Sequence, residues 1–185
     1  HTDGSGDLVV VHNGIIENYL PIKERLQAEG HVFKSETDTE VIAHLIERHL
    51  KDTPKLDEAV RRALRELRGS YAVVVLHRRM PGRLVAAKLG AGSVVVGLGE
   101  NETFLASDVP AFLAHTRKAV FLEDGEMAVL KRDGVSFFNL AGKKLEKTPL
   151  TISWDRTMAE KAGYRHFMLK EINEQPSSCE DTLRG

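Results

Sequence analysis

The chain has 185 residues, of which 42% are hydrophobic and 29% charged, and its formal net charge is -1. This length fits one domain with a single hydrophobic core, and no apolar run approaches the ~20 residues of a membrane helix. Because the net charge is close to zero, no global field attracts nucleic acid or an anionic membrane, and we expect neither partner.

The amino-terminal third of the sequence predicts one strand and three helices. The apolar run Leu8–Val11 is typical of a strand buried on both faces, and Asn13-Gly14 is expected to end it. Asn18 can cap a first helix that Gly30 closes. The order of elements is therefore strand, turn and helix.

A second helix is expected to begin near Asp38, because Thr37 and Glu40 have the spacing of a capping box. An apolar stripe follows over residues 41–50, and a third helix is predicted over Leu56–Leu67, before Gly69. The two stripes predict that these helices pack side by side.

From Ser70 onward the period changes to that of strands, separated by short turns that contain Gly or Pro. Such connections favour antiparallel strands over parallel crossovers, and the sequence predicts an α+β fold. The predicted strands are Tyr71–Leu76, Arg83–Leu89, Ser93–Gly97, Thr103–Ala106, Ala119–Leu122, Glu126–Leu130 and Val135–Phe138. Gly142–Asp155 is expected to be a covering loop or a linker, and Tyr164–Asn173 a helix that ends before Pro176.

Asn13-Gly14 allows two interpretations. Taken alone, Asn-Gly is the commonest two-residue hairpin turn. However, Ile15–Leu26 does not alternate as a returning strand would, which favours a strand-to-helix junction where glycine permits close approach of a ligand. Asp38 is similarly ambiguous, because a carboxylate in the first helical turn is stabilised by the helix dipole without any ligand.

Three segments resemble the glutaminase domain of glutamine:fructose-6-phosphate amidotransferases. They are Val10–Asn18 (VVHNGIIEN), Ser35–Ile42 (SETDTEVI) and Tyr164–Pro176 (YRHFMLKEINEQP). The resemblance implies an amino-terminal-nucleophile hydrolase fold, a four-layer α/β/β/α sandwich of antiparallel sheets that is incomplete at the amino terminus. It implies that the glutaminase domain spans residues 1–163. Residues 164–185 would form a carboxyl-terminal helix and the start of a linker toward an isomerase domain.

The resemblance also implies the chemistry. Asn13 would supply a side-chain amide and Gly14 a backbone N–H to the oxyanion formed from glutamine, and Asp38 would bind the glutamine α-ammonium. Ammonia released from L-glutamine would pass to a sugar-phosphate isomerase domain, which makes glucosamine 6-phosphate from fructose 6-phosphate. The parent protein would be a homo-oligomer without a metal or redox cofactor. The alternatives are the glutaminase domain of another class II amidotransferase and a catalytically inert remnant that binds glutamine or serves as an interaction domain.

The nucleophile is the main departure from the family. Members attack glutamine with an amino-terminal cysteine, whereas this chain begins at His1 and has one cysteine, Cys179. Glu180 and Asp181 beside Cys179 disfavour its thiolate, and a residue in mid-chain cannot use its own α-amine as base. We therefore expect the chain alone to be inactive.

The lone cysteine also excludes an internal disulfide and favours the cytoplasm as the compartment. The histidines do not show a zinc-binding pattern in sequence, because His44 and His49 are five residues apart and a helical zinc pair is separated by four. No metal site is expected from these spacings.

Overall fold

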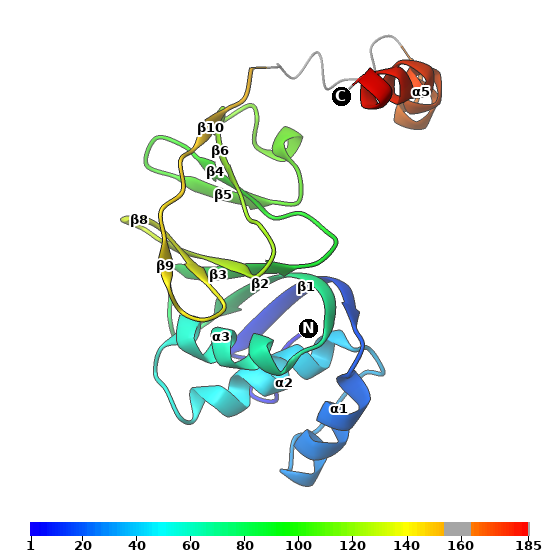
Figure 1. Ribbon diagram of the computed structural model, residues 1–185. Helices are drawn as coiled ribbons and strands as arrows, with labels where there is room; N and C mark the ends of the chain where they lie inside the picture. The colour runs from blue at the N-terminus through cyan, green and yellow to red at the C-terminus, as the bar shows by residue number, and fades with distance from the viewer. Residues whose placement is uncertain (154–163, 185) are drawn as a thin grey trace.

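The computed structural model describes residues 1–153 and 164–184 and contains two antiparallel sheets (Figure 1). The larger sheet has six strands in the order β1 (Leu8–Ile16), β2 (Gly69–His77), β3 (Arg83–Leu89), β7 (Glu126–Lys131), β8 (Gly134–Asn139) and β9 (Lys144–Leu145). The smaller has four strands in the order β10 (Leu150–Thr151), β6 (Lys118–Phe121), β4 (Val95–Leu98) and β5 (Thr103–Ala106). The predicted α+β class is confirmed.

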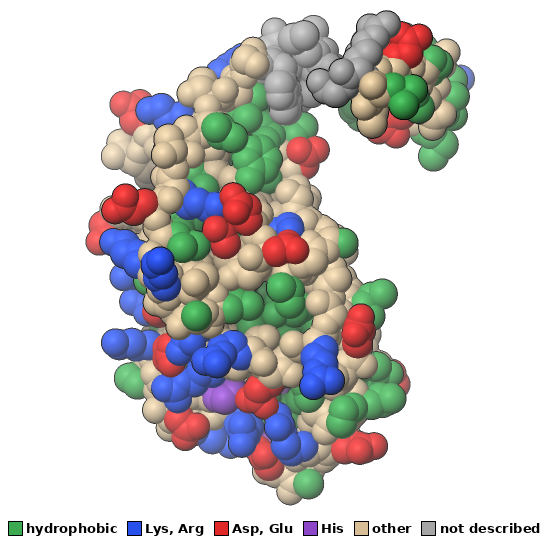
Figure 2. All heavy atoms as spheres, viewed as in Figure 1, with side chains coloured by type: hydrophobic (Ala, Val, Ile, Leu, Met, Phe, Trp, Pro, Cys, Tyr) green, Lys and Arg blue, Asp and Glu red, His purple; other side chains and the backbone are tan. Residues whose placement is uncertain are grey.

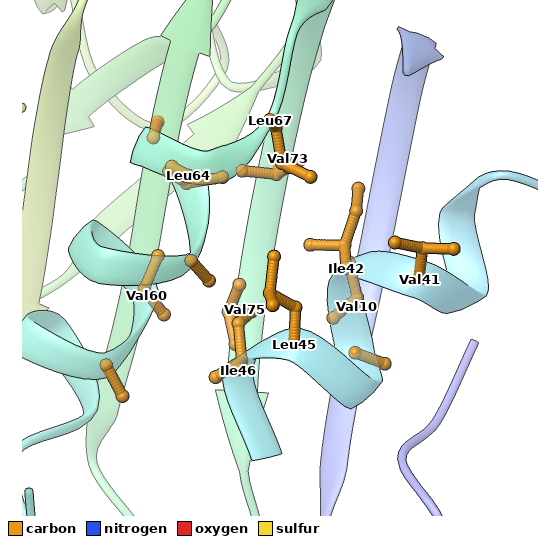
Figure 3. Packing of buried hydrophobic residues seen from close by; sticks show 14 of the residues in the cluster. Val10, Val41, Ile42, Leu45, Ile46, Val60, Leu64, Leu67, Val73 and Val75 are labelled. Atoms are coloured by element: carbon orange, nitrogen blue, oxygen red, sulfur yellow. The ribbon is translucent and has the colours of Figure 1, made fainter. Parts of the chain in front are cut away.

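The helices α2 (Thr39–Leu50) and α3 (Leu56–Glu66) cover one face of the larger sheet, and α1 (Tyr19–Ala28) packs against α2. Their apolar stripes form the main core with alternate residues of β1 and β2, as Figure 3 shows for Val10 and Val75 facing Ile42 and Leu45. The predicted second and third helices are confirmed, and they pack against each other as expected.

The opposite face of the larger sheet packs on the smaller sheet through a second core, which includes Ala86, Val96, Val120 and Leu130. On the outer face of the smaller sheet, the short 3-10 helix η1 (Val109–Ala111) and its neighbour Phe112 form a third cluster. Among the described residues, this segment lies where a fourth layer is expected.

Strand β1 differs from its prediction in two ways. Val9 is 37% exposed and Val11 is 66% exposed, whereas Leu8 and Val10 are buried, so only the face toward the helices is covered. The strand also continues to Ile16, because its hydrogen-bonded register with β2 continues past Asn13-Gly14. The pair is therefore neither a hairpin tip nor the end of the strand.

Two carboxyl-terminal predictions are also corrected. The segment expected to be a covering loop forms the two short strands β9 and β10; its last residues, 154 and 155, lie outside the described part. The helix α5 (Phe167–Arg184) continues through Pro176. The carbonyl that Pro176 leaves without a partner belongs to Ile172, on an exposed stretch of helix where water can bind it.

None of the helices in the described ranges has both the length and the apolar character needed to cross a membrane.

Candidate active site

The outer edge of β1 is the centre of the candidate site. Val10 and His1 exchange two backbone hydrogen bonds at this edge, with N···O distances of 2.8 and 2.9 Å. Ile16 also directs its N–H to this side, away from β2. Because backbone groups in a strand alternate, Gly14 presents its N–H to the same edge. No group in the described part of the chain accepts a hydrogen bond from this N–H on the outer side of β1. The N–H of Gly14 is therefore open to a ligand.

Gly14 cannot be replaced by a residue with a side chain in this geometry. Its φ is +139°, and an added Cβ would lie 2.1 Å from the carbonyl oxygen of Ser70 and 2.7 Å from the Cα of Tyr71. Both atoms belong to the backbone of β2, which cannot move without breaking the sheet. The absence of a side chain at Gly14 therefore allows the neighbouring strand β2 to lie close to β1. The sequence had suggested that the glycine makes room for a ligand.

The Asn13 side chain lies on the face of β1 that points away from the helices, which it shares with Val11 and Ile15. The residue is exposed, and its amide makes no hydrogen bond to any part of the chain that the structure describes. The amide of Asn13 and the N–H of Gly14 are thus two adjacent donors at an open sheet edge.

Asp38 lies at the same edge. Its Oδ2 accepts the N–H of Ile16 at 2.7 Å, and Ile16 is two residues, or about 7 Å of strand, from Gly14. Asp38 occupies the N-cap position of α2, but its side chain makes no capping hydrogen bond. The structure therefore brings the three sequence-predicted site residues to one edge.

The predicted capping box is not formed. The Glu40 carboxylate accepts the backbone N–H groups of Lys34 and Ser35, both at 2.7 Å, and the hydroxyl of Ser35, rather than the N–H of Thr37. Burial raises the pKa of Glu40, but these hydrogen bonds and the nearby His44 ring outweigh it and lower the pKa overall. Glu40 thus fastens the segment that leads to Asp38.

His12 is a site neighbour that the sequence did not single out. Its Nδ1 lies 2.8 Å from the Oγ1 of Thr39, which ties β1 to the first residue of α2 beside Asp38. Burial lowers the pKa of His12, and the nearby charge of Asp38 opposes this shift. The position of His12 directly before Asn13 was the only signal available in the sequence.

Cys179 is exposed on α5, which stands apart from both sheets in Figure 1. The arrangement at β1 thus offers donors for a developing negative charge and a carboxylate for a positive one.

The family was established by comparison with known proteins. The glutamine amidotransferase domain family matches residues 1–114, which include β1, its open edge and Asp38. The chain belongs to this family. The amidotransferase domain is 54% identical to glutamine–fructose-6-phosphate aminotransferase (isomerizing) from Methanothermobacter thermautotrophicus, over 99% of the chain and 31% of that relative. It is 50% identical to the enzyme of the same name from Aquifex aeolicus, over 100% and 31%. The chain thus spans about a third of these relatives.

Solved structures agree with the fold. Glutamine phosphoribosylpyrophosphate amidotransferase from Bacillus subtilis superposes on the amidotransferase domain with a TM-score of 0.64 and 27% identity, over 72% of this chain and 29% of that one. A class II glutamine aminotransferase domain protein from Silicibacter pomeroyi has a TM-score of 0.53 at 16% identity, over 76% and 69%. The amino-terminal-nucleophile hydrolase fold implied by the sequence is confirmed.

Proposed function

We propose that this chain is the glutaminase part of a glutamine:fructose-6-phosphate amidotransferase. The observation that carries the proposal is the open edge of β1, which holds the carboxylate of Asp38 together with the N–H of Gly14 and the amide of Asn13, two donors that have no acceptor among the described residues. Two donors and one carboxylate match two of the polar groups of glutamine: its side-chain carbonyl, which becomes an oxyanion, and its α-amine, which is a cation.

In the proposed reaction a cysteine thiolate attacks the side-chain amide of glutamine, and the C–N bond breaks to release ammonia. Water then hydrolyses the thioester to glutamate and regenerates the thiol. Asn13 and Gly14 stabilise the oxyanion in both tetrahedral states, and Asp38 holds the α-ammonium. Residues 1–185 offer only Cys179 as a thiol, so the attacking cysteine belongs to a segment outside them.

The proposed acceptor of ammonia is fructose 6-phosphate, converted to glucosamine 6-phosphate by an isomerase domain of the parent protein. The 54% identity to an aminotransferase named for fructose 6-phosphate supports this choice over a phosphoribosyl acceptor, for which the solved relative is 27% identical. We propose domain limits of 1–163 and 164–185, a homo-oligomeric parent and a cytoplasmic location.

The test is a glutaminase assay on two proteins, the chain alone and the chain joined to a Cys-led amino-terminal segment. We expect glutamate release only from the second. Robust turnover by residues 1–185 alone would overturn the assignment of roles. Binding of glutamine without turnover in either protein would favour the second candidate, an inert glutamine-binding domain.

A further inference from the structure

We propose that His31, His44 and Glu47 form a binding site for Zn²⁺ or a chemically similar divalent transition-metal ion. The Nδ1 atoms of the two histidines lie 3.2 Å apart, and each lies 3.1 Å from Oε2 of Glu47. The three side chains come from two places: the segment after α1, and one face of α2. The cluster does not include the residues of the proposed glutamine site.

The dimensions of this triangle suit a metal ion. Zinc binds imidazole nitrogen and carboxylate oxygen at about 2.0 to 2.2 Å, which places neighbouring ligands of a tetrahedral site about 3.3 Å apart. Three ligand atoms separated by 3.1–3.2 Å therefore form a tripod that needs almost no rearrangement. Two imidazoles and one carboxylate favour first-row transition metals over Mg²⁺ or Ca²⁺.

Hydrogen bonding alone does not satisfy the same triangle. The three contacts share at most two ring hydrogens, one on each Nδ1, so at least one pair of atoms is always in contact without a hydrogen between them. If both nitrogens donate to Glu47, the two N–H groups face each other at 3.2 Å. A cation at the centre removes this conflict, because all three lone pairs then point at it.

The surroundings also fit a metal site. The His44 side chain is 1% exposed and that of His31 is 6%, whereas that of Glu47 is 23% exposed and leaves a path for an ion and a water ligand. The Nε2 of His44 lies 3.5 Å from the carboxylate of Glu40. When Nδ1 binds a metal, Nε2 carries the ring proton, and a carboxylate beside it orients the ring.

The expected role is structural. The ion would fix His31, at the start of the extended segment after α1, to α2, and this segment continues to Asp38 at the other end. The spacing of histidines along the sequence does not indicate this site. Of the two histidines on α2, His44 belongs to the cluster, whereas the Nε2 of His49 lies 2.6 Å from the Glu66 carboxylate. The third ligand, His31, is brought in only by the packing of α1 on α2.

The experiment is a titration of the chelator-treated 185-residue chain with Zn²⁺ by calorimetry, and with Co²⁺ by visible absorption. We expect one ion per chain, a tetrahedral Co²⁺ spectrum, a higher melting temperature with Zn²⁺, and no binding of Mg²⁺. Glu47→Gln and His31→Ala should each lower the Zn²⁺ affinity at least about tenfold. His115→Ala, which changes an exposed histidine on the other side of the fold, should leave the affinity unchanged.

Glu47→Gln is the decisive variant, because it nearly preserves shape at a partly exposed position and circular dichroism can verify that it folds. The proposal is overturned if the unsubstituted chain binds no Zn²⁺ stoichiometrically. It is equally overturned if Glu47→Gln and His115→Ala bind Zn²⁺ as tightly as the unsubstituted chain.

Discussion

The Asp38 carboxylate accepts the backbone N–H of Ile16 at 2.7 Å, so the side chain proposed to bind the glutamine ammonium also fastens the start of α2 to the open edge of β1. One oxygen of the carboxylate makes this backbone hydrogen bond. The other lies 3.5 Å from the Thr39 hydroxyl, a weak contact that leaves it available to a ligand. The structural and binding roles of Asp38 can therefore be separated by substitution.

Asp38→Asn keeps an oxygen that can accept the Ile16 N–H but removes the charge. We expect this variant to fold with nearly unchanged stability and, in the domain that carries its nucleophile, to show a raised KM for glutamine. Asp38→Ala removes both functions and should also cost about 1 to 3 kcal/mol of unfolding free energy, because it leaves the Ile16 N–H unpaired. An unchanged KM in Asp38→Asn would remove Asp38 from the glutamine site.

Gly14→Ala should destabilise the fold by about 2 to 4 kcal/mol, because its Cβ would collide with the backbone of β2 at Ser70. Gly134→Ala is a matched control. Gly134 has φ +140°, nearly the same as Gly14, but nothing lies within 4 Å of an added Cβ. Chemical denaturation of both variants separates the collision from the backbone strain that they share, and equal losses would contradict the collision.

Asn13→Ala should lower kcat for glutamine hydrolysis by about 10² to 10³, with a smaller effect on KM, because an oxyanion donor acts mainly in the transition state. Its stability should be nearly unchanged, since the Asn13 side chain is exposed. Steady-state kinetics of the complete domain provide the measurement. Asn139→Ala at the end of β8 serves as the control, and a loss of kcat as large in that variant would refute a specific role for Asn13.

Glu58 predicts a pH dependence of stability. Hydrogen bonds from Arg61 and Arg62 lower the pKa of Glu58 from its usual 4.5 to about 2. Acidic and basic side chains are interspersed over the helical end of the molecule, as Figure 2 shows. A carboxyl group with a lowered pKa in the folded state stabilises the protein fully above pH 4.5. This stabilisation is lost as the pH falls to about 2.

Glu58→Gln should therefore be less stable than the unsubstituted chain above pH 4.5, by under about 1 kcal/mol because the ion pairs are near the surface. The difference should disappear near pH 2. Urea denaturation between these pH values measures it, and a difference that does not vary with pH would contradict the charge-based explanation.

The sequence determined the elements whose signals are local. The stripes of α2 and α3, and the strands bounded by Gly and Pro turns, follow from the side-chain period and the backbone preferences of a few neighbouring residues. The predicted boundaries of these elements differ from the observed ones by at most two residues, for example in β4, which begins at Val95 instead of Ser93. The motif around Asn13 and Gly14 likewise pointed to the family from sequence alone.

Tertiary structure decided what depends on partners far away in the chain. Pairing with β2 carries β1 past Asn13-Gly14 and turns the Gly14 N–H to an open edge. Long-range packing gives Asp38 its contact with Ile16 and His31 its contact with His44, which no capping or zinc spacing indicated. Hydrogen bonds and close contacts across tens of residues leave no periodic trace in the sequence, because their geometry exists only once the helices have packed on the sheet.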